Sequence, residues 1–325
     1  MNAGDASPNT LPAVMKVAFV APAFDDDEVQ SWRAALTAVT PPLEFITGAI
    51  PVEDEVDVAI VYYPPTGRLA RFRHLQAILS LSAGVETLLA DPQLPNVPLV
   101  RLMNADLQAL MREYVVYQVL RITRQFGDLE AARYLGRWTW TSPQTPASFW
   151  RVLVLGVGQL GAPSAEALRD LGFHVTGWSR CPRPIPGIRC VAGRLALEAA
   201  LPESDVVVSL LPLTRDTSGL LNANFFSRLP KGASLISAGR SGCIHEGDML
   251  SALATGQLSQ ATLDVFDTEP LPEDHVFWTH PRINITPHAA AHPRPESCVD
   301  QIAECLECCR RGVPLPSVVD KGRGY

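Results

Sequence analysis

The 325-residue sequence contains no uninterrupted apolar segment of the length that a membrane-spanning helix requires. Residues 1–12 also lack a basic stretch followed by an apolar one, so we expect no secretory signal there and instead a disordered tail. Basic residues do not predominate, because 27 Lys and Arg stand against 34 Asp and Glu and give a formal net charge of −7. This balance argues against a protein that binds nucleic acid or a membrane surface.

The seven cysteines form no pattern typical of a disulfide framework. An odd number of cysteines without a secretory signal predicts reduced thiols and a cytoplasmic location. Cys305 and Cys308 form a single Cys-x-x-Cys, and His288 and His292 form a His-x-x-x-His without the glutamate of a zinc protease helix. We therefore expect no metal site. We interpret four C-terminal cysteines as part of a buried helix face: Cys298, Cys305, Cys308 and Cys309.

Alternating strand and helix patterns predict an α/β fold. The length suits about two domains, and a hydrophobic content of 47% is ample for two cores. Between residues 15 and 102, short apolar strands alternate with helices, one of them expected over 69–76. A long helical pattern over 106–126 continues through 129–134 and precedes a second alternating series. A final helix is expected over 295–310.

The segment 152–161 carries the most informative single motif. Its first four residues are apolar and predict a buried strand, and three glycines then follow in the spacing G-x-G-x-x-G before a helical pattern over 159–171. A strand, a glycine turn and a helix in this order suit the pyrophosphate of a dinucleotide, which would face the N–H groups at the helix start. The residues that we expect to contact it are Gly156, Gly158, Gln159, Leu160 and Gly161.

The next predicted strand, 172–178, indicates which dinucleotide is preferred. A protein that prefers NAD usually carries a carboxylate after this strand, on the ribose 2′-hydroxyl. Here Ser179 occupies that position, and Arg180 and Arg183 follow it closely. Two guanidinium groups can pair with a 2′-phosphate. We therefore expect NADP(H) as the preferred cofactor, with NAD(H) still possible.

Polar side chains at the ends of later predicted strands fit the reduction of a 2-oxo acid. Arg240 offers a cation for the carboxylate and the carbonyl oxygen, and His288 is a proton donor near neutral pH. Glu269 would hold the other ring nitrogen and favour the protonated imidazole. The backbone of Ala83 and Gly84, before a short helix, could cradle a carboxylate, although that stretch alone is better explained as a plain turn.

Taken together, the motifs resemble those of the D-isomer-specific 2-hydroxyacid dehydrogenases, and among them the glyoxylate/hydroxypyruvate reductase A branch. The resemblance runs from about Met15 to Tyr325. The segments that carry it are Ser82–Val85, Met111–Tyr114, Gly156–Gly161, Trp178–Arg180, Leu211–Thr214, Leu263–Phe266, Glu269–Pro272, Thr286–His288 and Arg323–Tyr325.

The resemblance implies roles for these residues. It makes Arg240, Glu269 and His288 the catalytic residues, and it assigns the substrate carboxylate to Arg240 and the backbone of Ala83 and Gly84. Asp264 would meet the nicotinamide carboxamide. The remaining implied cofactor contacts are Leu211, Pro212 and Thr217 on the adenosine side, and Ala238 and Gly239 beside the nicotinamide.

The resemblance also implies an architecture. It predicts two doubly wound parallel-sheet domains of Rossmann or flavodoxin-like type, with the active site in the cleft between them. Residues 13–104 together with 292–325 would form the discontinuous substrate-binding domain, and residues 105–291 the NADP-binding domain. The family is commonly homodimeric, so we expect a homodimer.

The sequence departs from the family around the catalytic arginine. The family pattern is Asn-x-Ala-Arg-Gly, whereas this chain reads Ser237-Ala-Gly-Arg-Ser241. We expect Gly239 to loosen the backbone. We also expect Ser241 to strain the turn if that position requires a positive φ.

The leading hypothesis is NADPH-dependent reduction of a small anionic 2-oxo acid, such as glyoxylate or hydroxypyruvate, with His288 as proton donor. One alternative is a cofactor-sensing interaction protein on the same scaffold, like the corepressors of this family. Another is a 2-hydroxyacid dehydrogenase that acts on a bulkier substrate. The sequence leaves open the physiological substrate, the direction of the reaction and the role of His292.

Overall fold

The computed structural model describes residues 14–39, 42–48, 55–139 and 144–322. The expected N-terminal tail and the motif Arg323–Tyr325 lie outside these residues. The chain divides into two compact units, which we call unit 1 (Met1–Ala105 with Pro293–Tyr325) and unit 2 (Asp106–His292). Among the described residues, no helix is long and apolar enough to cross a membrane.

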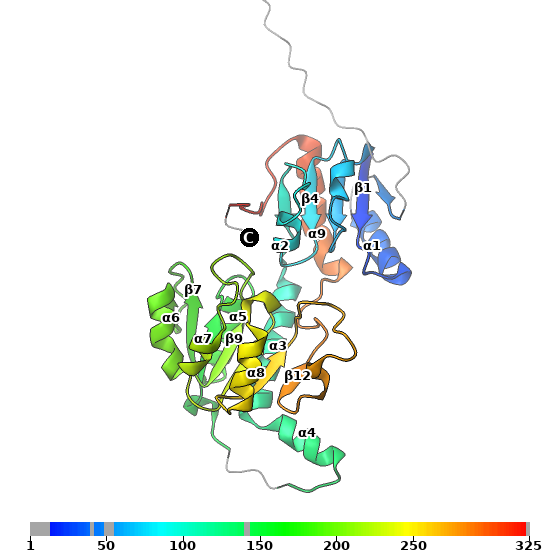
Figure 1. The fold of residues 1–325 in the computed structure, drawn as a ribbon. Coiled ribbons are helices and arrows are strands. Elements are labelled where there is room, and N and C mark those ends of the chain that lie inside the picture. Colours follow the sequence, from blue (N-terminus) through cyan, green and yellow to red (C-terminus); the bar gives the residue numbers. More distant parts are fainter. Residues whose placement is uncertain (1–13, 40–41, 49–54, 140–143, 323–325) are drawn as a thin grey trace, which may run out of the picture. The chain divides into compact units, whose positions relative to one another are not determined.

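Unit 1 is built on a parallel sheet of five strands in the order β2-β1-β3-β4-β5 (Figure 1). This is the flavodoxin-like order, in which the chain turns back between β1 and β3. Its strands carry almost continuous apolar residues because both faces of the sheet are covered. They are β1 Met15–Val20, β2 Leu43–Ile46, β3 Val58–Val61, β4 Ala77–Ser80 and β5 Leu99–Arg101.

Two helices from opposite ends of the sequence cover one face of this sheet. They are α1, Asp26–Val39, and α9, Pro295–Arg311, and both pack into one apolar core with β1, β3 and β4. The C-terminal cysteines lie on the packed side of α9, where Cys298, Cys305 and Cys309 are buried. The short helix α2, Glu86–Leu89, contributes to the core on the other face.

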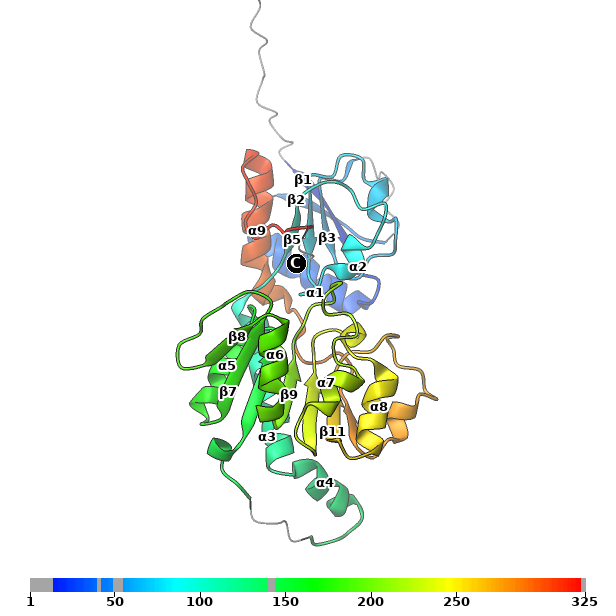
Figure 2. The same ribbon diagram turned by 60° about the vertical axis from the view of Figure 1, so that its left-hand side comes forward.

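Unit 2 contains a parallel sheet of seven strands in the order β12-β11-β10-β9-β6-β7-β8 (Figure 2). This is the Rossmann order, in which the winding reverses between β6 and β9, and ligands bind outside the carboxyl ends of strands at such a point. The glycine motif directly follows β6. The strands are β6 Arg151–Leu155, β7 His174–Ser179, β8 Arg189–Ala192, β9 Val206–Ser209, β10 Ala233–Ser237, β11 Leu258–Leu263 and β12 Ile283–Ile285.

Helices cover both faces of the seven-stranded sheet. On one face the core is formed with α3, Ala105–Thr123, and α5, Gly161–Asp170. On the other face it is formed with α6, Arg194–Ala200, α7, Ala223–Ser227, and α8, Glu246–Ala254. The predicted pair of doubly wound parallel α/β sheets is thus confirmed.

Two helix predictions were wrong in extent. The helix expected over 69–76 is only the 3-10 turn Leu69–Arg71, because Phe72 is extended with φ −89° and ψ 91°. The segment is a loop that buries three side chains one by one, and this produces the helix-like spacing of three: Leu69, Phe72 and Leu75. The long helix ends at Thr123, since Gln125 adopts φ 55°, and a separate helix, α4 Phe126–Tyr134, follows.

Candidate active site

The glycine turn after β6 is shaped by close backbone contacts. Gly156 has φ +91°, and a Cβ there would lie 2.9 Å from the carbonyl oxygen of Leu210. A Cβ on Gly161 would overlap the carbonyl oxygen of Gly156. At Gly158, by contrast, a Cβ would meet nothing within 4 Å, so this glycine faces open space. The first and third glycines are therefore required by packing, and the second leaves room beside the turn.

This turn fits the pyrophosphate of a dinucleotide. Within the part of the chain that the structure describes, the N–H groups of Gly158, Gln159 and Leu160 have no hydrogen-bond acceptor. They lie at the start of α5, a helix of ten residues whose N-terminal end carries partial positive charge. Unpaired N–H groups at a helix start form an anion-binding site.

The residues after β7 are held by local contacts. Ser179 Oγ donates a hydrogen bond of 2.6 Å to the carbonyl oxygen of Cys181. Arg180 pairs with Asp216, with Nη1 3.4 Å from Oδ2, and both side chains remain partly exposed. Arg183 is exposed. Sequence reasoning missed Asp216, because 36 positions separate it from Arg180.

The turn after β9 contains three of the predicted cofactor contacts. Thr217 Oγ1 donates a hydrogen bond of 2.6 Å to the carbonyl oxygen of Pro212 and accepts one of 2.8 Å from the backbone of Thr214. Thr217 therefore closes this turn, and Leu211 within it is buried. Ala238, directly after β10, is also buried, and its N–H donates to the carbonyl oxygen of Ser209.

The expectation about Gly239 was wrong, and the condition on which strain at Ser241 depended is not met. Gly239 does not loosen the backbone, because a Cβ at this position would lie 2.5 Å from the carbonyl oxygen of Leu211 and 2.6 Å from its nitrogen. Its lack of a side chain permits this close approach of two strand ends. Ser241 is not among the described residues with positive φ and begins a 3-10 turn, Ser241–Cys243, so no strain arises there.

The structure brings His288 and Glu269 together. His288 Nδ1 lies 2.8 Å from Glu269 Oε2, and the other carboxylate oxygen accepts a hydrogen bond of 2.9 Å from the backbone N–H of Phe266. Partial burial alone would raise the pKa of Glu269, but these two hydrogen bonds and the charges of His288 and Arg240 outweigh it and lower that pKa. Because Nδ1 is committed to Glu269, Nε2 is the ring nitrogen suited to proton transfer.

Arg240 lies between β10 and the 3-10 turn 241–243. Its Nη1 donates a hydrogen bond of 2.7 Å to the carbonyl oxygen of Gly239. Its charge acts on Glu269, so the three candidate catalytic residues gather in unit 2. A guanidinium fork, a paired imidazole and a carboxylate together can bind an anionic carbonyl compound and supply a proton to it.

Asp264 is more deeply embedded than its predicted contact with the nicotinamide suggested. Its side chain is 1% exposed and accepts hydrogen bonds from Thr286 Oγ1 at 2.5 Å and from the N–H groups of Ala289 at 2.9 Å and Ala290 at 3.0 Å. Its carbonyl oxygen accepts from the N–H of His288. Asp264 therefore anchors the turn that carries His288.

The predicted carboxylate cradle lies in unit 1. The N–H of Gly84 is 3.3 Å from Ser82 Oγ, and Arg101 Nη1 is 3.4 Å from the carbonyl oxygen of Ala83. Helix α2 has only four residues, so its dipole adds little. Arg101 instead brings a cation to this turn. Its position at the end of β5 was the signal that the sequence analysis overlooked.

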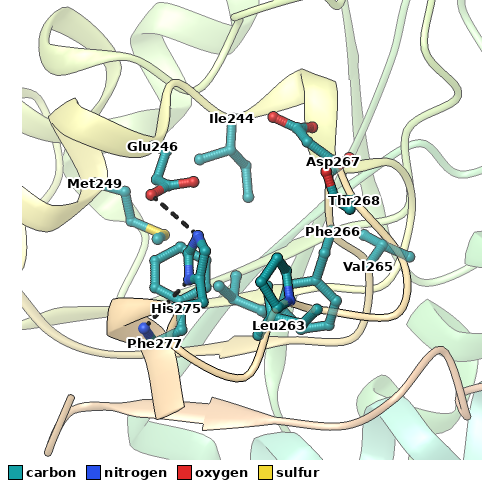
Figure 3. A pocket seen from close by; sticks show the side chains of 13 residues that line it. Ile244, Glu246, Met249, Leu263, Val265, Phe266, Asp267, Thr268, His275 and Phe277 are labelled. Carbon is teal, nitrogen blue, oxygen red and sulfur yellow. Dashed lines mark hydrogen bonds and ion pairs between the residues drawn. The ribbon is translucent and has the colours of Figure 1, made fainter. Parts of the chain in front are cut away.

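A separate pocket of about 100 Å³ lies beside the loop that carries Glu269 (Figure 3). His275 Nε2 and Glu246 Oε1 lie 3.7 Å apart on one side of it, and apolar side chains that include Met249 and Leu263 complete much of the lining. Arg240 and His288 do not line this pocket, so it does not coincide with the candidate catalytic residues.

The histidines and cysteines outside the catalytic group show no metal-binding arrangement in the described ranges, where no group of three or more His, Cys, Asp or Glu is placed to hold an ion. His292 is exposed. Burial raises the pKa of the Cys305 thiol to about 12 and that of Cys309 to about 11. These thiols behave as apolar core groups.

Comparison with known proteins identifies the family. The family model described as the D-isomer specific 2-hydroxyacid dehydrogenase, NAD binding domain, matches residues 116–290. Glyoxylate/hydroxypyruvate reductase A of Salmonella newport (strain SL254) is 36% identical over 317 residues, which cover 96% of this chain and 100% of that protein.

Two similar solved structures contain a nicotinamide cofactor. A D-isomer specific 2-hydroxyacid dehydrogenase from Xanthobacter autotrophicus Py2, in complex with NADPH and MES, is 37% identical, with a TM-score of 0.89 over 96% of this chain and 99% of that one. The NADPH-dependent glyoxylate/hydroxypyruvate reductase of Sinorhizobium meliloti, in complex with NADP and sulfate, is 36% identical, with a TM-score of 0.88 over 96% and 100%. As its motifs predict, the chain belongs to the D-isomer-specific 2-hydroxyacid dehydrogenase family.

Proposed function

We propose that this protein reduces a small 2-oxo acid, glyoxylate or hydroxypyruvate or a close relative, to the 2-hydroxy acid, with His288 as the proton donor. The observation that carries the proposal is the hydrogen bond of 2.8 Å between His288 Nδ1 and Glu269 Oε2, within the field of Arg240. Its family and relatives make the chain an NADP-dependent 2-hydroxyacid dehydrogenase. The two reductases named above act on glyoxylate and hydroxypyruvate by their descriptions, which supports the substrate class.

The preferred cofactor is NADP(H), in agreement with the NADPH and NADP complexes of similar proteins. The N–H groups of residues 158–160 would hold its pyrophosphate, and Arg180 with Arg183 would hold its 2′-phosphate. When bound, the cofactor supplies the hydride. The protein's own side chains would bind the substrate and donate the proton.

Arg240 would bind the substrate carboxylate through its guanidinium fork and polarise the carbonyl oxygen. His288 would give a proton from Nε2 to that oxygen as negative charge develops on it. Glu269, held by the backbone of Phe266, accepts the hydrogen bond at Nδ1 and so keeps the imidazole ring in one orientation. The backbone of Ala83 and Gly84 remains our proposed second contact for the carboxylate.

The division of labour between the units is also a proposal. We assign cofactor binding to unit 2, which carries the glycine turn and Arg180, and substrate binding to unit 1, which carries the Ala83–Gly84 turn. Cytoplasmic location stays a prediction from the cysteine content.

We further propose a homodimer that uses α4. This helix has no buried residue, and Figures 1 and 2 show it lying away from the sheet of its own unit. Exposed apolar side chains gather on and just after it: Phe126, Tyr134, Leu135 and Trp138. A second copy of the chain would bury them. Sedimentation should give a dimer for the wild type and a monomer for Tyr134→Glu; a monomeric wild type would contradict the proposal.

The decisive test is the loss of reduced-nicotinamide absorbance in the presence of purified protein. NADPH or NADH is offered with glyoxylate, hydroxypyruvate, pyruvate, phenylpyruvate or 2-oxoisocaproate. We expect oxidation of NADPH with the smallest acids, and a fall in kcat of about two to four orders of magnitude in His288→Ala. Tight NADPH binding without turnover on any acid would favour the cofactor-sensing alternative, and a response only to the larger acids would favour the bulkier substrate.

A further inference from the structure

The motif Met111–Tyr114 on α3 has so far no role in the chemistry. The structure places the phenol oxygen of Tyr114 2.8 Å from Thr286 Oγ1, and Thr286 Oγ1 in turn donates a hydrogen bond of 2.5 Å to Asp264 Oδ1. The contact joins two residues separated by 172 positions. It therefore links α3 to the turn after β12 that carries His288.

The direction of this hydrogen-bond chain follows from the hydrogens available. A threonine hydroxyl has one hydrogen, and Thr286 gives it to Asp264. Tyr114 must therefore donate to Thr286. Burial, with the charge of Asp264 adding to it, raises the pKa of Tyr114 well above its ordinary value, so the phenol keeps its proton. Thr286 and Gln118, a buried residue one helical turn later, act against this rise without outweighing it.

The turn at the end of this chain needs support. His288 has φ +51°, in the left-handed region that side-chain-bearing residues seldom adopt. Such a conformation persists only where the surroundings hold it. Here Asp264 provides the support, because its carbonyl oxygen accepts from the N–H of His288 and its carboxylate accepts from Ala289 and Ala290.

We infer that Tyr114 is a positioning residue, whose hydroxyl acts through Thr286 and Asp264 to hold the 286–290 turn and thereby keep the His288 ring paired with Glu269. The phenol orients the Thr286 hydroxyl, and the hydroxyl fixes one carboxylate oxygen of Asp264. The carboxylate then fixes the two N–H groups that follow His288. The catalytic consequence rests on the proposed function, whereas the structural consequence does not.

Matched variants separate this role from general stability. Tyr114→Phe removes only the hydroxyl, and Tyr117→Phe makes the same change on the same helix at a side chain that is 54% exposed. Thr286→Val removes the relay hydroxyl at nearly constant volume, and Thr286→Ser retains it. If Tyr114→Phe fails to fold, the comparison of Thr286→Val with Thr286→Ser still tests the hydrogen-bond chain.

The kinetic readout is turnover with NADPH and the best 2-oxo acid. We expect Tyr114→Phe and Thr286→Val each to lower kcat about ten- to a hundredfold, because a small displacement of a proton donor has effects of this size. The KM for NADPH should stay unchanged, and the deuterium isotope effect with 4-deuterated NADPH should rise as the chemical step slows. The double variant should be no worse than either single one, since both break the same chain.

A second readout needs no activity. In the same proteins, hydrogen–deuterium exchange of peptides covering 286–290 should accelerate in Tyr114→Phe and Thr286→Val, and stay at the wild-type rate in Tyr117→Phe and Thr286→Ser. An inactive wild type would refute the proposed function, and exchange alone would then decide the positioning role. Wild-type exchange in Tyr114→Phe and Thr286→Val, or additive losses of kcat in the double variant, would overturn the inference.

Discussion

Gly239 and Leu211 approach each other so closely that a Cβ on Gly239 would lie 2.5 Å from the carbonyl oxygen of Leu211. The two Leu211 atoms that such a Cβ would meet are backbone atoms, so rotating a side chain cannot relieve the contact. Gly239, which departs from the family pattern, therefore fits the close approach of the Leu211 backbone. The segments that follow β9 and β10 meet here, next to Arg240.

Restoring the family alanine should consequently be harmful. We expect Gly239→Ala to lower the free energy of unfolding by about 1–3 kcal/mol through overpacking and to weaken NADPH binding. Thermal unfolding and a fluorescence titration with NADPH measure the two effects. Gly247→Ala is the control, because its Cβ would meet only His245, at an ordinary 3.8 Å, inside α8. Equal behaviour of the two variants would show that the 239–211 contact tolerates a methyl group.

The charge of Glu269 should contribute to stability in a defined pH window. Its pKa is lowered in the folded protein, so the unfolded chain binds more protons and stability rises with pH through this window. Glu269→Gln removes the charge and leaves one acceptor oxygen for the two donors, His288 and the N–H of Phe266. The difference in stability between wild type and variant should be largest above the ordinary pKa of glutamate, and should shrink as pH falls through the lowered pKa. Thermal unfolding at a series of pH values tests this, and a difference independent of pH would contradict it.

The pair between Arg180 and Asp216 should influence cofactor choice. Arg180→Ala should raise the Kd for NADPH far more than that for NADH, since only NADPH carries the 2′-phosphate. Asp216→Asn should instead lower the Kd for NADPH, because the Asp216 carboxylate competes with the 2′-phosphate for the guanidinium of Arg180. Titration of both cofactors into both variants gives the answer. Equal effects of Arg180→Ala on the two cofactors would remove Arg180 from phosphate recognition.

Thiol reactivity should separate the cysteines by burial. Cys181 is exposed and adjoins Arg180, whereas Cys305 and Cys309 are buried with raised pKa values. Because the thiolate is the reactive form, iodoacetamide should label Cys181 in the folded protein and spare the other two. NADPH should slow the labelling of Cys181, and Cys181→Ser serves as the control. Peptide mass spectrometry reads the sites, and early modification of Cys305 would contradict the packing of α9.

Patterns of neighbouring residues explain most of what could be predicted. The strand, glycine turn and helix over 151–170 are local features, and the alternation of apolar runs with helical periods sufficed for two parallel sheets. The spacing of apolar residues was a less reliable guide where contacts with distant parts of the chain decide which side chains are buried. The turn at residues 69–71 has helical spacing without a helix, and Gln125 breaks a pattern that looked continuous.

The sequence by itself determined the family, the order of the motifs and the nature of the cofactor, because each depends on residue types a few positions apart. Only the tertiary structure decided how the site is supported. It paired Arg180 with Asp216, brought Tyr114 to Thr286 and set Gly239 against Leu211. These contacts join distant segments through the packing of strands and helices, and atomic distances of this kind leave no periodic trace along the chain.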